Sequence, residues 1–559
     1  MRIPLPTLSA LALLASPAAA QLDTSGQHLF TLEGEVFLGR FGWDVAAGDV
    51  DGDGYDDLVA GAPSEPVPGF GGGLARIYSG RDGLLIRELP PLGAGGDFGE
   101  AVAVLGDLNS DGAAEVGIGA PEAEFLGAFP GRVNVYDGAT GALLASLGGS
   151  EWFDAFGQDL AGIGDVDLDG VPDFAVGAPR PQTQPPFQPG PGSVRVYSGA
   201  TLQPFGTLSG ANDFDAYGQT VAAAGDVNLD GHPDLLVGVP GFDSNGLINN
   251  GRVEIVSGEW IAVAAAGGTP LTPQVLGTYD GEFDQGRLGF AIAGVGDTNL
   301  DGYPDLLAGA PEADLNGFFR GVADLLSGEH FALTSVGGTP RTLARLDRFA
   351  GEGERDLFGR SVSALGDLDG DGAQDFVIGA SESFSPGPGP GYATAFSGLN
   401  GDDFFTYRGG DGGDRVGWAL SGGGIDFDAD GTPDLAMGAD IGSGDINGNG
   451  TAHMLSGRRL LLSSTEHLLS IAAGGGPELF IDADDAAGDF YFLLGSATGT
   501  EPGIPVLASG QVLPLTLDAY FNLTLAEAVP FLQDLARSQD RDAGLGAGGG
   551  AEQEVEVAR

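Results

Sequence analysis

The first acidic segment of the sequence reads Asp49-Val-Asp-Gly-Asp-Gly-Tyr-Asp-Asp57, with carboxylates at its positions 1, 3, 5 and 9. Together with the backbone carbonyl of position 7, these side chains offer the hard oxygen ligands that Ca²⁺ prefers. Glycine at position 6, Gly54, permits the positive φ that would fold the segment around an ion. The alternative is a solvated acidic turn, since Asp and Gly favour turns in any case. Because closely spaced carboxylates repel one another without a cation, the spacing favours a calcium loop.

This segment returns at a regular interval along the chain. Its first acidic residue stands at positions 49, 107, 165, 226, 297, 367 and 426, which gives about 63 residues per unit. A pair such as Phe41-Gly42 comes before each acidic segment, and five of the seven units end in an apolar-Pro pair such as Ala62-Pro63. The period is longer than that of solenoid repeats and close to the length of a propeller blade.

Each unit contains four strand-like runs, which in the first unit begin with residues 45–47 and 58–60 on either side of the acidic segment. Four strands repeated radially form a β-propeller, and its closure protects the edges of the sheets. The sequence therefore predicts an all-β fold, a seven-bladed propeller over residues 28–457. Residues 28–32 resemble a fourth strand, and we expect them to complete the seventh blade. Residues 460–462 are the alternative closing strand.

Composition and charge exclude several classes of function. The chain has 559 residues and a formal net charge of −56, with no Lys and no Cys. Nucleic-acid binding needs clustered positive charge, so we expect no nucleic-acid partner. The absence of Cys excludes disulfides, thiolate metal sites and Cys nucleophiles. The five His residues are scattered, and no Ser/His/Asp order or His metal cluster stands out, so we expect no enzymatic activity.

The N-terminus has the pattern of an export signal: Arg2, an apolar stretch over residues 8–15, and Ala18-Ala19-Ala20 before Gln21. This pattern predicts a signal peptide over residues 1–20, cleaved after Ala20. No later stretch offers the roughly 18 apolar residues that a transmembrane helix needs. We therefore expect a protein that is secreted, extracellular or held in the cell envelope.

The Phe-Gly and Gly-Ala-Pro elements that flank an Asp-x-Asp-x-Asp-Gly-x-x-Asp segment resemble the FG-GAP repeats of the integrin α-chain head. The resemblance covers roughly residues 28–457. It implies Ca²⁺ in the acidic loops, about one ion per blade, although integrin heads carry such loops in only some blades. The second unit departs furthest from the pattern, because Glu115 stands at its ninth position.

The resemblance carries the same ligand roles to all seven loops, with the position-7 residue contributing only its backbone carbonyl. The predicted ligands are Asp49, Asp51, Asp53, Tyr55 and Asp57; Asp107, Asn109, Asp111, Ala113 and Glu115; Asp165, Asp167, Asp169, Val171 and Asp173; Asp226, Asn228, Asp230, His232 and Asp234; Asp297, Asn299, Asp301, Tyr303 and Asp305; Asp367, Asp369, Asp371, Ala373 and Asp375; and Asp426, Asp428, Asp430, Thr432 and Asp434.

For function, the resemblance implies an adhesion or recognition module that binds an unknown surface protein or glycan, and we expect a monomeric propeller. The alternatives are a polysaccharide-acting propeller enzyme and a structural envelope or matrix protein. Binding is expected on the face opposite the acidic loops, where variable connections carry aromatic residues. The predicted contacts are Trp152, Phe153, Phe187 and Phe242. The alternative is that these rings pack between blades.

After residue 457 the repeat ends. Residues 465–540 contain strand-like runs at 479–481, 490–494 and 512–517, with a helical pattern around 525–537, and predict a small, mostly-β C-terminal domain. The Gly- and Glu-rich residues 541–559 predict a disordered tail.

Overall fold

A computed structural model describes residues 28–67, 71–93, 95–124, 129–180, 190–265, 274–315, 318–328, 341–342, 344–381, 389–410, 414–441 and 448–458, together with five short strands between 469 and 555. Contacts divide the chain into two compact units, Met1–Ser463 and Ser464–Arg559. The predicted signal peptide over residues 1–20 lies outside the described residues.

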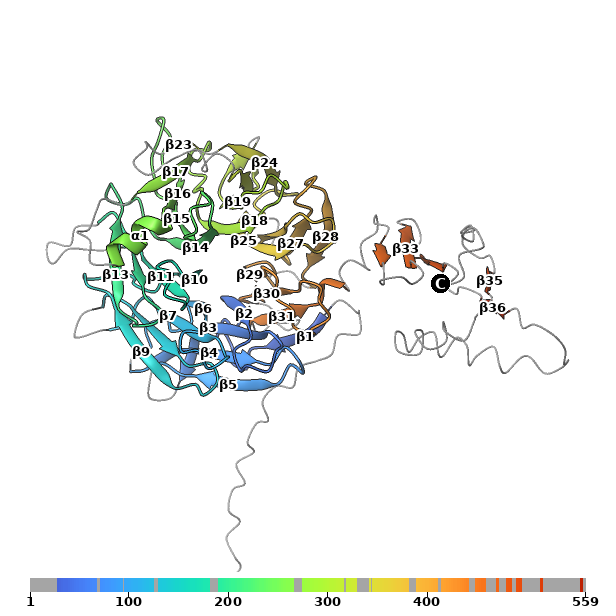
Figure 1. Cartoon of the computed structure of the whole chain (residues 1–559), viewed down its shortest axis with the longest axis horizontal. Helices are drawn as coiled ribbons and strands as arrows, with labels where there is room; N and C mark the ends of the chain where they lie inside the picture. Colours follow the sequence, from blue (N-terminus) through green and yellow to red (C-terminus); the bar gives the residue numbers. More distant parts are fainter. Residues whose placement is uncertain are drawn as a thin grey trace, which may run out of the picture. The chain divides into compact units, whose positions relative to one another are not determined.

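The first unit is a seven-bladed β-propeller (Figure 1), as the repeats predicted. Each blade contains four antiparallel strands, and in the first six blades these strands follow one another in chain order from the axis outward. The first three blades are β2 (Val45–Gly48), β3 (Asp57–Val67), β4 (Gly71–Tyr78) and β5 (Leu85–Leu89); β6 (Ala101–Gly106), β7 (Glu115–Ala120), β8 (Arg132–Tyr136) and β9 (Leu143–Gly148); and β10 (Leu160–Gly164), β11 (Asp173–Ala178), β12 (Ser193–Tyr197) and β13 (Pro204–Ser209).

The next three blades follow the same plan. They are β14 (Thr220–Gly225), β15 (Asp234–Val239), β16 (Arg252–Val256) and β17 (Val275–Asp280); β18 (Ala291–Gly296), β19 (Asp305–Ala310), β22 (Val322–Leu326) and β24 (Arg345–Ala350); and β25 (Phe358–Gly366), β26 (Asp375–Ala380), β27 (Tyr392–Phe396) and β28 (Asp403–Arg408).

The seventh blade joins the two ends of the propeller. It consists of β29 (Ala419–Ser421), β30 (Leu435–Ala439), β31 (Thr451–Leu455) and, on the outside, β1 (His28–Glu33). Strand β1 pairs antiparallel with β31, with Thr31 opposite His453. The N-terminal run therefore completes the blade, as expected, and residues 460–462 do not. The innermost strands contact one another in ring order, and β29 also contacts β2.

The Phe-Gly and Gly-Ala-Pro elements hold neighbouring blades together. The amide N–H of Gly99 donates to the carbonyl of Gly119 in its own blade, at 2.9 Å. On its other side, Gly99 lies so close to Gly61 of the preceding blade that a Cβ on Gly61 would collide with the Gly99 carbonyl. The same contact occurs at all seven blade interfaces, including Gly438 against Gly42. Only glycine permits this approach of two backbones. The Phe side chain, as in Phe98, is buried between the sheets.

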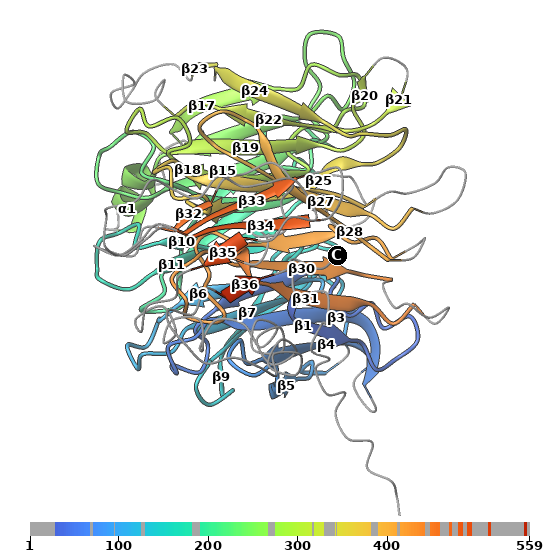
Figure 2. The same ribbon diagram turned by 90° about the vertical axis from the view of Figure 1, so that its right-hand side faces the viewer.

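The two faces of the propeller differ in their connections. The acidic segments join the first and second strands, so they share one face with the connections between third and fourth strands. Helix α1 (Gly258–Ala265) lies in such a connection of the fourth blade, whereas β20 (Asp314–Leu315) and β21 (Phe318–Phe319) lie between the second and third strands of the fifth. Figure 2 shows α1 and the β20–β21 pair at opposite faces.

The long third-to-fourth connection of the fifth blade reaches its neighbour. Strand β23 (Arg341–Thr342) pairs in parallel with β17, placing Gly277 opposite Arg341. It thereby becomes a fifth strand at the outer edge of the fourth blade. Neither this pairing nor α1 was predicted from the sequence.

The second unit is described only through five short strands. Strands β32 (Leu469–Ile471), β33 (Leu479–Asp484) and β34 (Asp489–Leu494) form an antiparallel sheet, and β35 (Leu513–Leu515) pairs with β36 (Gln553–Val555). The runs expected at 479–481, 490–494 and 512–517 thus contain strands. The helical pattern around 525–537 lies outside the described residues, and the C-terminal domain stays a prediction. Strand β36 lies within the segment predicted to be a disordered tail.

Candidate functional site

Each acidic segment forms a tight loop between the two innermost strands of its blade. In the first blade the Asp49 carboxylate accepts N–H bonds from Gly52 at 2.8 Å and Gly54 at 3.0 Å, which wraps the backbone around that side chain. The position-6 glycine has a positive φ in every loop, from 83° to 94°. The local reasoning about Gly54 therefore holds across the repeat.

The structure adds a second left-handed position that sequence reasoning missed. Position 4 of every loop also has a positive φ, and in three loops this residue is an exposed leucine: Leu168, Leu229 and Leu300. Leucine rarely adopts this conformation, so the surrounding hydrogen bonds must impose it. Glycine at this position in the first and sixth loops, Gly52 and Gly370, is the only sequence signal for it.

The ninth residue of the loop is a buried carboxylate that ties three segments together. In the first blade one Asp57 oxygen accepts the N–H groups of Val50 and Asp51, both at 3.1 Å. The other oxygen accepts the N–H of Gly80, after the third strand, at 3.2 Å. In each of the other five loops that end in Asp, the ninth residue likewise accepts an N–H from the loop and one from the glycine after the third strand. This residue therefore positions the loop whether or not it also binds an ion.

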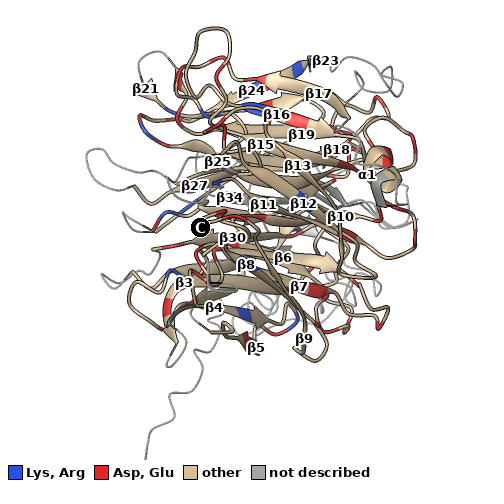
Figure 3. Cartoon of the chain, turned by 90° about the vertical axis from the view of Figure 1, so that its left-hand side faces the viewer, with Lys and Arg blue, Asp and Glu red and all other residues tan. Residues whose placement is uncertain are grey.

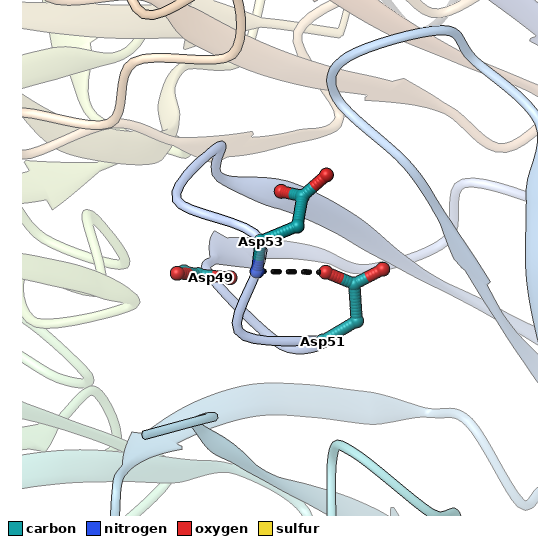
Figure 4. A group of neighbouring side chains, drawn as sticks. All are labelled: Asp49, Asp51 and Asp53. Atoms are coloured by element: carbon teal, nitrogen blue, oxygen red, sulfur yellow. Dashed lines mark hydrogen bonds between the residues drawn. The ribbon is translucent and has the colours of Figure 1, made fainter.

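The predicted ligands converge in the structure. In Figure 4 the carboxylates of Asp49, Asp51 and Asp53 surround one small region, and the N–H of Asp53 donates to Asp51 at 3.1 Å. One carboxylate oxygen from each of these three residues lies within 4.8 Å of the others. Similar trios occur in the third, sixth and seventh loops, formed by Asp165, Asp167 and Asp173; Asp367, Asp369 and Asp371; and Asp426, Asp428 and Asp434.

The donor set fits Ca²⁺. It consists of hard oxygen atoms at the positions expected from spacing, and the trios together include positions 1, 3, 5 and 9. Arginine compensates these charges in only part of the loops, with Arg81 4.0 Å from Asp53 and Arg458 3.6 Å from Asp430. The acidic loops share a face with α1, and Figure 3 shows Asp and Glu in red on connections at that face.

The second loop is built differently from the other six. Glu115 accepts the N–H of Leu108, and its other oxygen accepts the side-chain amide of Asn109 at 2.7 Å. The amide nitrogen of Asn109 also donates to Asp137 at 3.2 Å. Asp137 precedes the glycine after the third strand, at the position where the other blades have serine. One of its carboxylate oxygens lies within 4.8 Å of one oxygen each of Asp111 and Glu115. The sequence analysis missed Asp137, although its departure from the repeat was visible.

Burial strongly perturbs the ninth-position carboxyls in the absence of an ion. Burial is the largest cause, and it raises the pKa of Asp57, Asp375, Asp434 and Glu115 to about 7. The pKa of Asp234 rises to about 8 for the same reason, with the charges of Asp230 and Asp226 adding to it. A cation in the loop would favour the charged carboxylates and lower these pKa values.

The predicted binding face carries exposed aromatic rings. Phe153 is 41% exposed and stacks on Phe129, with ring centroids 6.4 Å apart, and Trp152 lies beside it at 6.2 Å. Phe37 and Phe214, also on fourth-to-first connections, are 63% and 73% exposed. Phe153, Phe37 and Phe214 are therefore exposed and not packed between blades, whereas Trp152 is half-buried.

Phe242 has a different environment from Trp152 and Phe153. The Arg252 guanidinium lies 3.7 Å from the centre of its ring, and the ring packs against the core between the third and fourth blades. Phe242 therefore contributes to the fold, and only part of its surface is accessible. Phe187 lies outside the described residues.

Acidic residues near the axis, which an enzyme would need, have structural partners. Asp44 is placed by β2 and accepts the N–H of Val102 in the next blade at 2.7 Å. Asp159 makes the equivalent bond to Val221 at 2.7 Å. These two carboxylates join neighbouring innermost strands, which accounts for their position through the fold. No helix within the described part of the chain is long and apolar enough to cross a membrane.

Comparison with known proteins identifies the repeat. The FG-GAP repeat family matches residues 41–78, 217–253 and 358–397, in the first, fourth and sixth blades. The chain is 34% identical to integrin alpha-6 of Gallus gallus over 168 residues, 28% of this chain and 15% of that protein. It is 30% identical to integrin alpha-5 of Xenopus laevis over 228 residues, 40% of this chain and 20% of that protein.

A longer match is to a protein of another kind. The chain is 29% identical to phosphatidylinositol-glycan-specific phospholipase D of Bos taurus over 389 residues, 61% of this chain and 43% of that protein. The matches thus span a fifth or less of these integrin chains and under half of the phospholipase. The chain carries FG-GAP repeats folded into a seven-bladed β-propeller, and it is similar to integrin α-chains and resembles their head.

Proposed function

We propose that the chain is a secreted, calcium-loaded recognition module that binds a protein or glycan at a cell surface through the face opposite its acidic loops. The observation that carries this proposal is the contrast between the two faces. One face carries the seven acidic loops, four of which bring three aspartate carboxylates within 4.8 Å of one another. The other presents exposed rings such as Phe153, Phe37 and Phe214 on connections held by a rigid ring of sheets.

The FG-GAP repeats and the similarity to integrin α-chains support the same function. Export through the predicted signal peptide would place the propeller where millimolar calcium can load its loops. About one Ca²⁺ per blade is the proposed content, with affinities in the range of extracellular modules, about 0.1–1 mM. The ions would be structural, because each loop is tied to the innermost hairpin of its blade.

The test is a protein and glycan array probed with the purified chain, first with calcium and then with EGTA. Calcium-dependent binding to a defined partner supports recognition. Turnover of a polysaccharide would instead support the enzymatic alternative, for which Asp44 and Asp159 offer little because both accept backbone N–H bonds. If the chain shows neither binding nor turnover, the remaining candidate is a structural envelope or matrix protein.

The binding face can then be tested with a matched pair of variants in one blade. Phe153→Ser removes an exposed ring, whereas Phe156→Ser removes the fully buried ring of the Phe-Gly pair. We expect Phe153→Ser to weaken partner binding while the melting temperature stays nearly unchanged. Phe156→Ser should lower the melting temperature strongly, since truncating a buried Phe costs about 3–5 kcal/mol. Full binding by Phe153→Ser would remove that ring from the proposed contact surface.

A further inference from the structure

Seven residues form a ring around the propeller axis on the face opposite the acidic loops. Each directly follows the glycine of a Phe-Gly-type pair; six of them precede an innermost strand, and Arg360 lies near the start of β25. In every copy its N–H donates to the carbonyl three residues earlier, as in Arg360 to Leu357 at 3.0 Å, which fixes a tight turn. This axial ring consists of Trp43, Glu100, Gln158, Gln219, Phe290, Arg360 and Trp418.

Neighbours in the axial ring touch one another across blade boundaries. The Arg360 guanidinium lies 4.6 Å from the centre of the Phe290 ring and 4.0 Å from that of Trp418. Trp418 in turn packs against Trp43, with centroids 4.8 Å apart. Four consecutive members of the ring are therefore in contact, with one cation between two aromatic side chains.

Among the described residues, neither Arg360 nor Arg40 near the axis has an ion-pair partner, but Arg360 lies between two aromatic rings. Among the described residues, its guanidinium has no hydrogen-bond or ion-pair partner, and its contacts are with the two aromatic rings. Burial lowers its pKa to about 10, so it is still charged at neutral pH. Arg360 is half-buried, and its guanidinium nitrogens are not among the fully buried, unpartnered polar atoms of the described residues, so they keep some contact with solvent. A partly desolvated guanidinium with unused donors is costly until an acceptor arrives.

The carboxylates that act on Arg360 electrostatically are engaged elsewhere. Asp440 pairs with Arg415 at 3.4 Å, Glu100 accepts the amide of Gln158 at 3.4 Å, and Asp44 accepts a backbone N–H. None of the three lies within ion-pair distance of Arg360. Within the described part of the chain no carboxylate pairs with Arg360, so its donors are available to an acceptor from a partner.

We propose that the Arg360 guanidinium, held between Phe290 and Trp418, binds the carboxylate of an aspartate or glutamate side chain from a partner protein. The planar fork of arginine donates two parallel bonds to a carboxylate, and the flanking rings fix its plane while leaving the edge free. This proposal deepens the proposed recognition function and rests on it for the identity of the partner.

A protein side chain fits this site better than an acidic sugar. Sugar rings are bound by stacking on free aromatic faces, but guanidinium groups already cover the tryptophans of the axial ring. Arg40 lies 4.5 Å from the centre of the Trp43 ring, and both Arg360 and Arg415 lie over Trp418. What the site offers is a single forked donor, which suits a slim carboxylate side chain.

The test uses Trp43 and Trp418 as fluorescent reporters beside the site. The calcium-loaded protein is titrated with a blocked glycine pentapeptide carrying one central aspartate, and with its asparagine counterpart. We expect a saturable fluorescence change with the aspartate peptide and none with the asparagine peptide. Methyl glucuronide and methyl glucoside form the second arm. A response to the glucuronide without a response to the aspartate peptide would overturn the assignment to a protein partner.

Variants then assign the binding to Arg360. Arg360→Gln should lower the affinity for the aspartate peptide at least about tenfold. Arg360→Lys should lower this affinity less, because it keeps the charge but loses the forked donor geometry. Arg287→Gln is the matched control, because Arg287 precedes a Phe-Gly-type pair on the same face but pairs with Glu312 at 3.1 Å. Unchanged affinity in a folded Arg360→Lys or Arg360→Gln variant would overturn the proposal.

The two proposals fail separately. If the Arg360→Gln variant no longer binds the aspartate peptide but keeps full binding to an array partner, the axial ring is not the recognition site, and the proposed function stands. If the aspartate peptide binds through Arg360 but the array yields no partner, the carboxylate site stands, and the proposed function loses its support.

Discussion

Calcium removal should destabilise the propeller by an amount that the structure allows to be estimated. At about 10 mM Ca²⁺ and dissociation constants of about 0.1–1 mM, each bound ion raises the free energy of unfolding by about 1.4–2.7 kcal/mol, because it binds the folded state. Seven ions in one cooperative unit would raise its free energy of unfolding by about 10–19 kcal/mol. Unfolding a unit of roughly 430 residues changes the entropy by about 0.9 kcal/mol/K, so EGTA should lower the melting temperature by about 11–21 °C.

The structure supports treating the loops as one unit. The N–H of Ala114 in the second loop donates to the carbonyl of Asp49 in the first, at 2.9 Å, and Gln374 donates to Asp297 at 3.0 Å. Asp426 of the seventh loop donates to the Asp56 side chain of the first, at 2.7 Å. Loops thus contact their neighbours across blade boundaries, and loss of one ion should weaken the next interface.

The assay is differential scanning calorimetry in calcium, in EGTA, and in EGTA with excess Mg²⁺. Mg²⁺ demands a stricter octahedral geometry, so we expect it to restore little of the loss. The double variant Asp165→Ala and Asp169→Ala should remove one site, reduce calcium bound in titration calorimetry by one ion, and produce about one seventh of the shift. A melting temperature that changes by less than a degree or two on EGTA addition would refute structural calcium in these loops.

Two further predictions follow from the blade interfaces. Gly119→Ala should destabilise the propeller by about 2 kcal/mol or more, because the added Cβ would collide with the Gly157 carbonyl of the next blade. Gly206→Ala is the control and should be nearly neutral, because there is open space where its Cβ would lie. Urea unfolding measures both changes. Burial raises the pKa of Asp44 and Asp159 to about 7 each, so their charges destabilise the folded state above pH 7, and this penalty is relieved as the pH falls through the folded pKa. In saturating calcium we therefore expect the free energy of unfolding to rise by about 1.4 kcal/mol per carboxyl between pH 8 and pH 6. The double variant Asp44→Asn and Asp159→Asn should flatten this pH dependence. An unchanged slope of stability against pH would show that other groups titrate.

The sequence by itself determined the repeat and the acidic loops, and it left two candidate strands for the closure of the ring. The acidic spacing could be read because each loop is held by bonds between residues two to seven positions apart, such as Gly54 to Asp49 and Val50 to Asp57. The Phe-Gly signal recurs because every blade repeats the same interface. Counting four strands per blade offered residues 28–32 or 460–462 as the closing strand, and the pairing of β1 with β31 decided for the first.

The tertiary structure alone decided how distant blades meet. Nothing local in the sequence brings Arg360, Phe290 and Trp418 together, because their contact depends on the ring geometry that places the starts of three innermost strands around one axis. The same holds for Gly61 against Gly99, and for β23 at the edge of β17. Such contacts depend on the summed placement of whole sheets, which no short-range spacing encodes, whereas the loops depend only on backbone bonds within themselves.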